Sequence, residues 1–363
     1  MRSKSIKERV LVTGAGGFVG RHVVMAAISE GFSVRATDLP GPDLSWAEEL
    51  GAEVIRADLT QINQIKSIVK DVDYIAHIAA VYNLGMPRNQ ICHINVNGSK
   101  NLAEIAARSG VRHFVNCSTA DTYGNHKKIP ITESFRQKPE NDYAYSKLEA
   151  EKIVSLIGER DGLAVTTLRP TMIYGPGSIY TASLFCTIPF IVNKYLPYMP
   201  RLSGGPKLNT VHVQDMAAAT IYAINHPEMA GDFYNVADDC WQTVGTFINN
   251  LITPLGIPQT SFSIPIQRFF VKWGAEALML TPQTGLSMIT HFLQKEWSDH
   301  IQKHQLIPAL NPQFDKGFLT YGSGDHVFDN TKLKAAGFSF KWPDFSIGWQ
   351  DTVMWYKDNH WIP

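Results

Sequence analysis

Short apolar runs alternate with longer amphipathic stretches over the first 170 residues of the chain. The apolar runs are nearly continuous, as expected for strands covered on both faces of a parallel sheet. They are RVLVT (9–13), SVRATD (33–38), EVIRAD (53–58), YIAHIAA (74–80), HFVNCST (113–119) and VTTLRP (165–170). Between them, residues such as Leu102, Ile105 and Ala106 repeat at helical spacing. This alternation predicts βαβ units and hence an α/β fold with a doubly wound parallel sheet.

After Pro170 the pattern loosens. Prolines and glycines become frequent, and aromatic and aliphatic residues crowd 179–200 and 264–295. A short apolar run at 232–237 (DFYNVA) could return one strand to the sheet. We therefore expect a sheet domain and a smaller C-terminal substrate-binding cap. The sheet domain spans 1–175 with a returning segment near 208–240, and the cap spans 176–207 and 241–363.

Composition narrows the class of protein. Of the 363 residues, 44% are hydrophobic and 18% are charged, which is enough apolar material for a large core. Thirty-three basic residues balance 33 acidic ones, so the basic surplus of a nucleic-acid-binding protein is missing. The four cysteines form no CxxC pair, and His93, His113 and His126 have no partner at metal spacing, so no metal site is expected. Without a signal peptide or an 18-residue apolar run, a cytoplasmic location is predicted.

A glycine-rich segment, TGAGGFVG (13–20), follows the first strand. Gly14, Gly17 and Gly20 have the spacing of a loop that turns tightly, approaches a pyrophosphate and packs a helix on a sheet. The following helix would offer its free N–H groups to the anion. Asp38 ends the second strand, where a carboxylate binds ribose hydroxyls and repels a 2′-phosphate. These residues predict a Rossmann-type domain that binds NAD rather than NADP.

The segment YAYSK (143–147) places Tyr143 and Lys147 four residues apart, on one face of a helix. A phenol is a poor base at its ordinary pKa of about 10, but a neighbouring ammonium stabilises the phenolate. The pair follows the fifth strand, whose carboxyl end belongs to the edge where open α/β sheets bind ligands. It is therefore a candidate for general acid–base catalysis.

Further motifs accompany these in chain order. They are Asp58-Leu59, HIAA (77–80), NVNG (95–98), CSTADTYG (117–124), LRPTMIYGPG (168–177) and VHVQDMAAA (211–219). Together the motifs resemble the extended short-chain dehydrogenase/reductases, the NAD-dependent epimerase/dehydratase superfamily, over residues 8–240. Within this superfamily the chain looks most like the 3β-hydroxysteroid dehydrogenase branch.

The resemblance implies roles for individual residues. Tyr143 is expected to be the general acid and base, Lys147 to lower the pKa of Tyr143 and hold the nicotinamide ribose, and Thr119 to hydrogen-bond the reacting oxygen. Tyr145 is expected to face elsewhere. The expected cofactor contacts lie in the glycine loop and at the ends of later strands. They are Gly14, Gly17, Phe18, Val19, Gly20, Asp38, Asp58, Leu59, Ala79, Ala80, Tyr143, Lys147, Pro170 and Met172.

Three local features bear on the substrate. Sugar dehydratases of this superfamily carry an acid pair after the catalytic threonine, but here the pair is Ala120-Asp121, which disfavours dehydration. Nucleotide-sugar enzymes commonly have an arginine before the VHV segment to bind a diphosphate. Here Leu208 follows Lys207, which could partly substitute. The segment 179–192 is apolar, which fits either the cap core or an apolar pocket.

The residues and the resemblance together predict an NAD-dependent dehydrogenase/reductase that interconverts a secondary alcohol and a ketone. Its expected substrate is apolar, such as a sterol, a steroid or a long-chain hydroxy or keto acid. A nucleotide-sugar epimerase that retains its NAD stays open as an alternative, and a non-catalytic NAD-binding protein as a remote one. The exact substrate, the direction and a second step such as isomerisation or decarboxylation stay undetermined.

The expected partners are a small apolar substrate and a second copy of the chain, with no nucleic acid. The resemblance implies a homodimer formed through helices around 97–108 and 142–158. A second apolar block, 269–280, has mixed helical periodicity. Packing within the protein is the preferred interpretation of this block, and weak contact with a membrane surface is the alternative.

Overall fold

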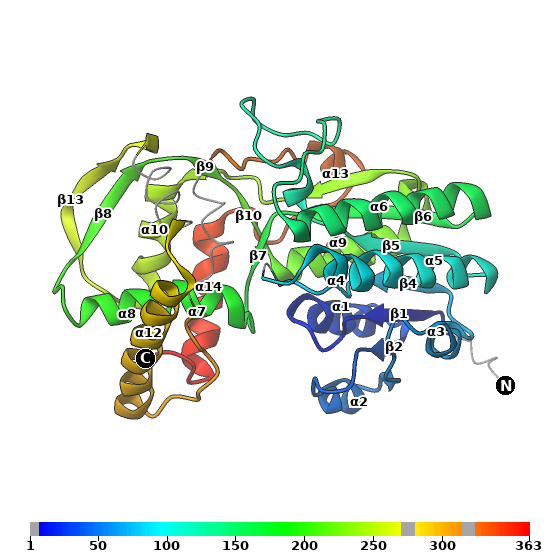
Figure 1. Ribbon diagram of the computed structural model, residues 1–363, viewed down its shortest axis with the longest axis horizontal. Helices are drawn as coiled ribbons and strands as arrows, with labels where there is room; N and C mark the ends of the chain where they lie inside the picture. Colours follow the sequence, from blue (N-terminus) through cyan, green and yellow to red (C-terminus); the bar gives the residue numbers. More distant parts are fainter. Residues whose placement is uncertain (1–6, 84, 270–279, 314–323) are drawn as a thin grey trace.

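The computed structural model describes residues 7–83, 85–269, 280–313 and 324–363, which form two lobes (Figure 1). One lobe holds a large sheet with its helices, and the other holds the cap. The apolar block predicted at 269–280 lies, apart from its two end residues, outside the described residues. Within the described residues, no helix combines the length and the hydropathy needed to cross a membrane.

The larger lobe is built on a seven-stranded sheet in which every neighbouring pair is parallel. In spatial order the strands are β11 (Phe233–Val236), β6 (Ala164–Pro170), β5 (His113–Cys117), β4 (Tyr74–His77), β1 (Arg9–Thr13), β2 (Ser33–Thr37) and β3 (Glu53–Val54). The six early apolar runs and the late run at 232–237 each coincide with one of these strands to within a few residues. The predicted doubly wound sheet is therefore confirmed.

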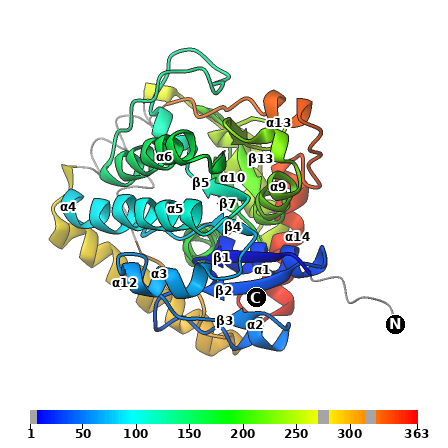
Figure 2. The same ribbon diagram turned by 90° about the vertical axis from the view of Figure 1, so that its right-hand side faces the viewer.

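Both faces of the sheet are covered, which explains why its strands are continuously apolar. Val10 and Val12 pack in one core cluster with α1 (Phe18–Ser29) and α9 (Val213–Asn225). Leu11, between them, points to the other face. It packs there with α3 (Ile62–Val69), α5 (Gly98–Arg108) and α6 (Asp142–Asp161). Figure 2 shows α5 and α6 on one side of the strands and α9 on the other.

Shorter elements complete the larger lobe. They are α2 (Ser45–Glu49), α4 (Arg88–Cys92), a π-helix (His93–Asn97), α13 (Thr331–Ala335) and two 3₁₀ turns, Ala120–Tyr123 and Pro227–Met229. Beside them, β7 (Met172–Tyr174) and β10 (Thr210–His212) pair in parallel and lead from the sheet to the cap.

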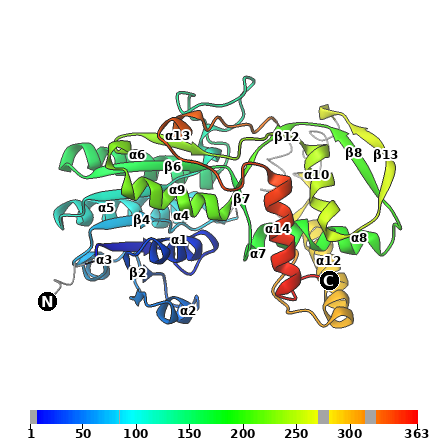
Figure 3. The ribbon, with the colours of Figure 1, turned by 180° about the vertical axis from the view of Figure 1, so that it is seen from behind.

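The cap surrounds a core of its own. Its helices are α7 (Ile179–Phe185), α8 (Thr187–Asn193), α10 (Val244–Ile252), α12 (Gln283–His304) and α14 (Phe345–Asp358), with a 3₁₀ turn at Thr253–Leu255. Its strand pairs are β8 (Met199–Gly204) with β13 (Gln259–Ile266), and β9 (Lys207–Leu208) with β12 (Gln242–Thr243). Trp297, Trp349 and Tyr356 are buried at its centre. From behind, α14 lies between the sheet lobe and α10 (Figure 3).

One part of the C-terminal segment does not belong to the cap. Leu333 and Phe338 pack in the core cluster of α1 and α9, and the Tyr222 hydroxyl of α9 donates to Ala336 O (2.7 Å). Assigning all of 241–363 to the cap was therefore wrong for this stretch, because its apolar side chains cover the outer face of α9. The remaining domain boundaries stay a prediction.

Candidate active site

A cleft of about 560 Å³ opens at the carboxyl ends of the sheet strands and is bounded on the cap side by α7. Its volume lies within the range of small-molecule sites. Every site residue expected from the sequence lines this cleft. They are Gly14, Gly17, Phe18, Val19, Gly20, Asp38, Asp58, Leu59, Ala79, Ala80, Thr119, Tyr143, Lys147, Pro170 and Met172. The structure thus brings them together, while the role of each stays a prediction.

The glycine loop has the backbone that its sequence predicts. Gly14 has φ +69°, a backbone conformation that residues with a side chain rarely adopt. A Cβ on Gly20 would lie 2.0 Å from Gly14 O, so no side chain fits there. Gly17 caps α1 without a side chain, which leaves the first turn of the helix open to the cleft. The Asp38 carboxylate accepts the Gly16 N–H (2.8 Å) and so ties the end of β2 to the loop.

The cleft also has the polar groups that NAD requires. The helix N-terminus and the loop suit a pyrophosphate, and the Asp38 carboxylate suits ribose hydroxyls. Three buried hydroxyls on the cleft wall, those of Thr37, Ser118 and Thr171, have no hydrogen-bond partner among the described residues. Because buried polar groups are normally paired, these hydroxyls are available to a ligand. The residues present therefore fit the cofactor.

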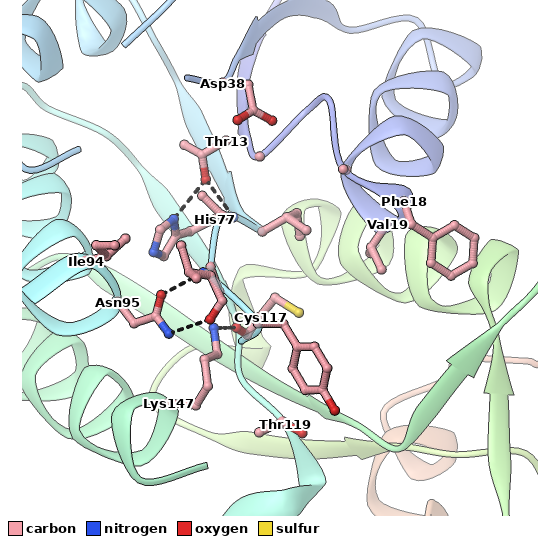
Figure 4. A pocket seen from close by; sticks show the side chains of 18 of the residues that line it. Thr13, Phe18, Val19, Asp38, His77, Ile94, Asn95, Cys117, Thr119 and Lys147 are labelled. Carbon is pink, nitrogen blue, oxygen red and sulfur yellow. Dashed lines mark hydrogen bonds between the residues drawn. The ribbon is translucent and has the colours of Figure 1, made fainter. Parts of the chain in front are cut away.

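A buried histidine supports the floor of the cleft (Figure 4). His77 Nδ1 lies 2.8 Å from Thr13 Oγ1, and its Nε2 lies 2.8 Å from Ser99 Oγ. Since Ser99 Oγ donates to Asn95 O, it must accept from Nε2–H, and Nδ1 then accepts from Thr13. Burial lowers the pKa of His77 to about 3, with a smaller effect from Lys147. His77 is thus a neutral structural hydrogen-bonder.

Asn95 lies in the π-helix and connects three segments around the cleft (Figure 4). Its amide oxygen accepts Val81 N–H (2.8 Å), while its amide nitrogen donates to Val81 O (3.1 Å) and to Ser146 Oγ (2.9 Å). Ser146 Oγ in turn donates to Tyr143 O. Asn95 was not among the predicted site residues, although its NVNG motif was the signal that could have revealed its role.

Helix α6 presents the predicted catalytic pair. Asn141 starts the helix by accepting Ala144 N–H (2.8 Å), so that Tyr143 and Lys147 follow in the first two turns. The Lys147 ammonium donates to Cys117 O at the end of β5 (2.5 Å). Tyr145 does not line the cleft and lies under the Arg88 guanidinium, which confirms that it faces elsewhere.

Thr119 begins the 3₁₀ turn Ala120–Tyr123 and is buried at the cleft. Its hydroxyl oxygen accepts the Asp121 N–H (3.2 Å), so the hydroxyl hydrogen can be donated to a ligand. Asp121 also lines the cleft, while Ala120 is buried in a core cluster. The cleft thus contains one acid after Thr119 and lacks the pair that sugar dehydration uses.

The buried position of Tyr143 affects its ionisation. Burial raises the pKa of Tyr143 well above its usual range, and nearby Cys117, Asp121 and Tyr82 raise it further. The lowering of the Tyr143 pKa expected from Lys147 stays a prediction; the Lys147 ammonium donates to Cys117 O. Burial also lowers the pKa of Lys147.

The expected substitute for a phosphate-binding arginine lies away from the cleft. The Lys207 ammonium sits 3.8 Å from the centre of the Trp241 ring, and its backbone N–H donates to Asp325. Leu208 is buried in the cap core. None of these residues lines the cleft in the described part of the chain.

The apolar segment 179–192 serves mainly as cap core. Leu184, Phe185 and Ile191 are buried in the cap cluster, while Tyr180 and Thr181 line the cleft. Of the two interpretations, core packing therefore applies to most of the segment and a pocket wall only to its start. No group of three or more His, Cys, Asp or Glu side chains suited to a metal occurs among the described residues.

Comparison with known proteins decides the family. The NAD dependent epimerase/dehydratase family matches residues 10–237, well over half of the chain. The chain belongs to this family. NAD is accordingly its cofactor, as the sequence predicted, and the family is one of NAD-dependent oxidoreductases and epimerases.

Relatives in the family represent more than one substrate class. The chain is 24% identical to a UDP-glucose 4-epimerase of Vibrio cholerae over 72% of this chain and 80% of that protein. It is 32% identical to a 3 beta-hydroxysteroid dehydrogenase/Delta 5→4-isomerase of Mycobacterium tuberculosis over 47% of this chain and 48% of that protein. The chain spans only about half the length of several curated relatives that it matches.

Solved structures share the fold over nearly the whole chain. The UDP-glucose 4-epimerase of Thermotoga maritima with UDP-glucose superposes with a TM-score of 0.70 at 20% identity. The match covers 96% of this chain and 99% of that one. At this identity the likeness establishes the fold and leaves the substrate undecided.

Proposed function

We propose that this enzyme is an NAD-dependent dehydrogenase/reductase that interconverts a secondary alcohol and a ketone on an apolar substrate. One observation carries the proposal. Among the described residues that line the cleft, Lys147 is the sole lysine or arginine, and its ammonium already binds Cys117 O. A nucleotide diphosphate needs cationic partners on the substrate side, most often bidentate arginines.

The residues before the VHV segment support the same choice. Asn209 and Thr210 directly precede the VHV segment, where nucleotide-sugar enzymes commonly have an arginine, and both are buried. Asn209 donates to Phe328 O, and the Thr210 hydroxyl donates to the Asp238 carboxylate (2.8 Å). The side chains of Asn209 and Thr210 are therefore engaged in hydrogen bonds within the protein and do not bind a phosphate.

In the proposed mechanism, the Tyr143 phenolate takes the hydroxyl proton of the alcohol, and the neutral phenol returns it in the reverse reaction. NAD, when bound, supplies the hydride acceptor or donor. Thr119 donates its hydroxyl hydrogen to the reacting oxygen and so fixes the substrate beside Tyr143. Lys147 holds the catalytic side of α6 to β5 through its hydrogen bond to Cys117 O.

A nucleotide-sugar epimerase is the second candidate. It is favoured by the UDP-glucose 4-epimerase of Vibrio cholerae, which matches more of the chain than the mycobacterial dehydrogenase does. This candidate requires Lys207 to leave Trp241 and bind a phosphate.

Calorimetric titration of UDP into the NAD-loaded protein separates the two candidates. The proposed function predicts no saturable heat up to millimolar UDP, for the natural protein and for Lys207→Ala alike. Micromolar binding of UDP that disappears in Lys207→Ala would contradict the proposal and favour the epimerase.

A further inference from the structure

Three tyrosine rings meet at the substrate end of the cleft. The ring centres of Tyr82 and Tyr143 are 4.7 Å apart with an interplanar angle of 82°. Tyr82 also contacts Tyr180, with ring centres 5.4 Å apart at 77°. Both are preferred edge-to-face arrangements of aromatic rings. All three rings line the cleft, so Tyr82 joins the candidate catalytic residue to the cap helix α7.

The position of Tyr82 is fixed by the residue before it. The Val81 backbone is held at both its N–H and its carbonyl by the Asn95 side chain, which is 2% exposed. The same amide binds Ser146, which is hydrogen-bonded to Tyr143 O. One buried side chain thus sets the distance between the Tyr82 loop and the turn of α6 that carries Tyr143.

Tyr180 is fixed from the cap side. Its helix begins after Ser178, whose hydroxyl is 2.5 Å from Thr181 Oγ1. The buried Tyr356 hydroxyl lies 2.9 Å from Gly175 O and 3.0 Å from Ser178 O. The first turn of α7 is therefore anchored on α14, and Tyr180 has a defined place opposite Tyr82.

The backbone at both outer tyrosines is anchored, and yet their side chains are partly exposed. Tyr82 is 39% exposed and Tyr180 is 40% exposed, although both line the cleft. Aromatic surface of this kind gains stability when an apolar ligand covers it. A tyrosine has only two side-chain torsions, so on an anchored backbone it loses little conformational freedom when it meets a rigid partner.

We propose that Tyr82 and Tyr180 form a specificity-determining wall, which holds a flat, apolar ring system beside Tyr143 and so favours ring alcohols over open-chain alcohols. This inference rests on the proposed function and refines its substrate class. Tyr82 acts as the central member because it touches both other rings, whereas Tyr180 extends the wall onto the cap.

The test is the binding preference of the NAD-loaded protein for two probes, dehydroepiandrosterone as the ring alcohol and 2-dodecanol as the open-chain alcohol. Dissociation constants are measured for the natural protein, Tyr82→Ala, Tyr82→Phe and Tyr198→Ala. Tyr198 is an exposed cap tyrosine outside the described wall of the cleft and serves as the matched control. The affinity for NAD, measured separately, reports that each variant is folded.

We expect the natural protein, Tyr82→Phe and Tyr198→Ala to bind the ring alcohol at least about tenfold more tightly than the open-chain alcohol. In Tyr82→Ala the preference should fall to about threefold or less, with NAD affinity unchanged. The proposed role of Tyr82 and Tyr180 would be contradicted if the natural protein bound neither probe or bound both equally. It would also be contradicted if the preference for the ring alcohol survived in Tyr82→Ala. Binding with the expected preference but without NADH formation would overturn the proposed function and leave the wall intact.

Discussion

Tyr143 carries the chemistry of the proposed reaction in a single hydroxyl group. Replacing it with phenylalanine keeps the ring contact with Tyr82 and removes the proton carrier. We expect kcat for Tyr143→Phe to fall at least about 100-fold, the size typical of lost general acid–base catalysis. NAD affinity should stay within about threefold, as measured by calorimetry.

Tyr145→Phe is the matched control for this prediction, because Tyr145 lies two residues away and outside the described wall of the cleft. It should keep nearly full activity. Equal activity of the two phenylalanine variants would remove Tyr143 from the mechanism.

The raised pKa of Tyr143 predicts opposite pH profiles for the two directions. Alcohol oxidation needs the phenolate, so its rate should rise across the alkaline range, whereas ketone reduction needs the phenol and should decline there. Because the Asp121 carboxylate helps to raise the pKa of Tyr143, Asp121→Asn should move both midpoints to lower pH. Initial rates at saturating substrate test this. Midpoints that do not move would show that another group controls the profile.

Asp38 is predicted to decide which dinucleotide is accepted. Its carboxylate at the cleft repels a 2′-phosphate, and reversing the charge removes the partner of the ribose hydroxyls. Asp38→Arg should weaken NAD binding at least about tenfold. Glu49→Arg makes the same charge change on α2 and should leave NAD binding unchanged. Unaltered affinity in Asp38→Arg would refute the assignment of Asp38.

At the scale of elements, the start of α9 makes stability depend on pH. His212 caps this helix by accepting Gln214 N–H, and burial lowers its pKa to about 3. The unfolded chain takes up a proton near pH 6.5 that the folded state excludes until about pH 3, so stability falls as pH falls through this window.

Asn at this position can cap the helix and has no proton to take up. Between pH 7.5 and 4.5, the free energy of unfolding of His212→Asn should therefore fall by about 2–3 kcal/mol less than that of the natural protein. Urea titrations at each pH measure the difference. Equal losses of unfolding free energy in the natural protein and in His212→Asn would mean that His212 is protonated in the folded state.

The sequence revealed the sheet far better than the cap. Strands covered on both faces are continuous apolar runs, and all seven were found within a few residues of their ends. In the cap, β8 pairs with β13 from about 60 residues away, and no local pattern marks such a partner. The π-helix around Asn95 is a local distortion that helical spacing does not reveal.

The site shows the same division. Residues within motifs, such as Tyr143 and Thr119, could be predicted because their spacing along the chain is typical of the catalytic role. Tyr82, Tyr143 and Tyr180 meet only through the fold. The engagement of Lys147 by Cys117 O likewise depends on where the end of β5 meets α6.

At the scale of the whole molecule, the homodimer through α5 and α6 stays a prediction. Leu156 on α6 is 54% exposed, and Leu50, at the end of α2, is 48% exposed. Leu156→Arg should convert a dimer to monomers in sedimentation velocity, because a charge buried at an interface is costly. Leu50→Arg should leave the dimer intact. A natural protein that sediments as a monomer would contradict the prediction.

The proposed function requires that the cleft between sheet and cap oxidises an apolar alcohol with NAD. The most direct measurement incubates the protein with excess NAD and either a pool of hydroxysteroids and long-chain secondary alcohols or a pool of nucleotide sugars, and follows NADH absorbance over many turnovers. We predict multiple-turnover NADH from the apolar pool and none from the sugars. Interconversion of sugar isomers without free NADH, together with no NADH from the apolar pool, would contradict the proposed function.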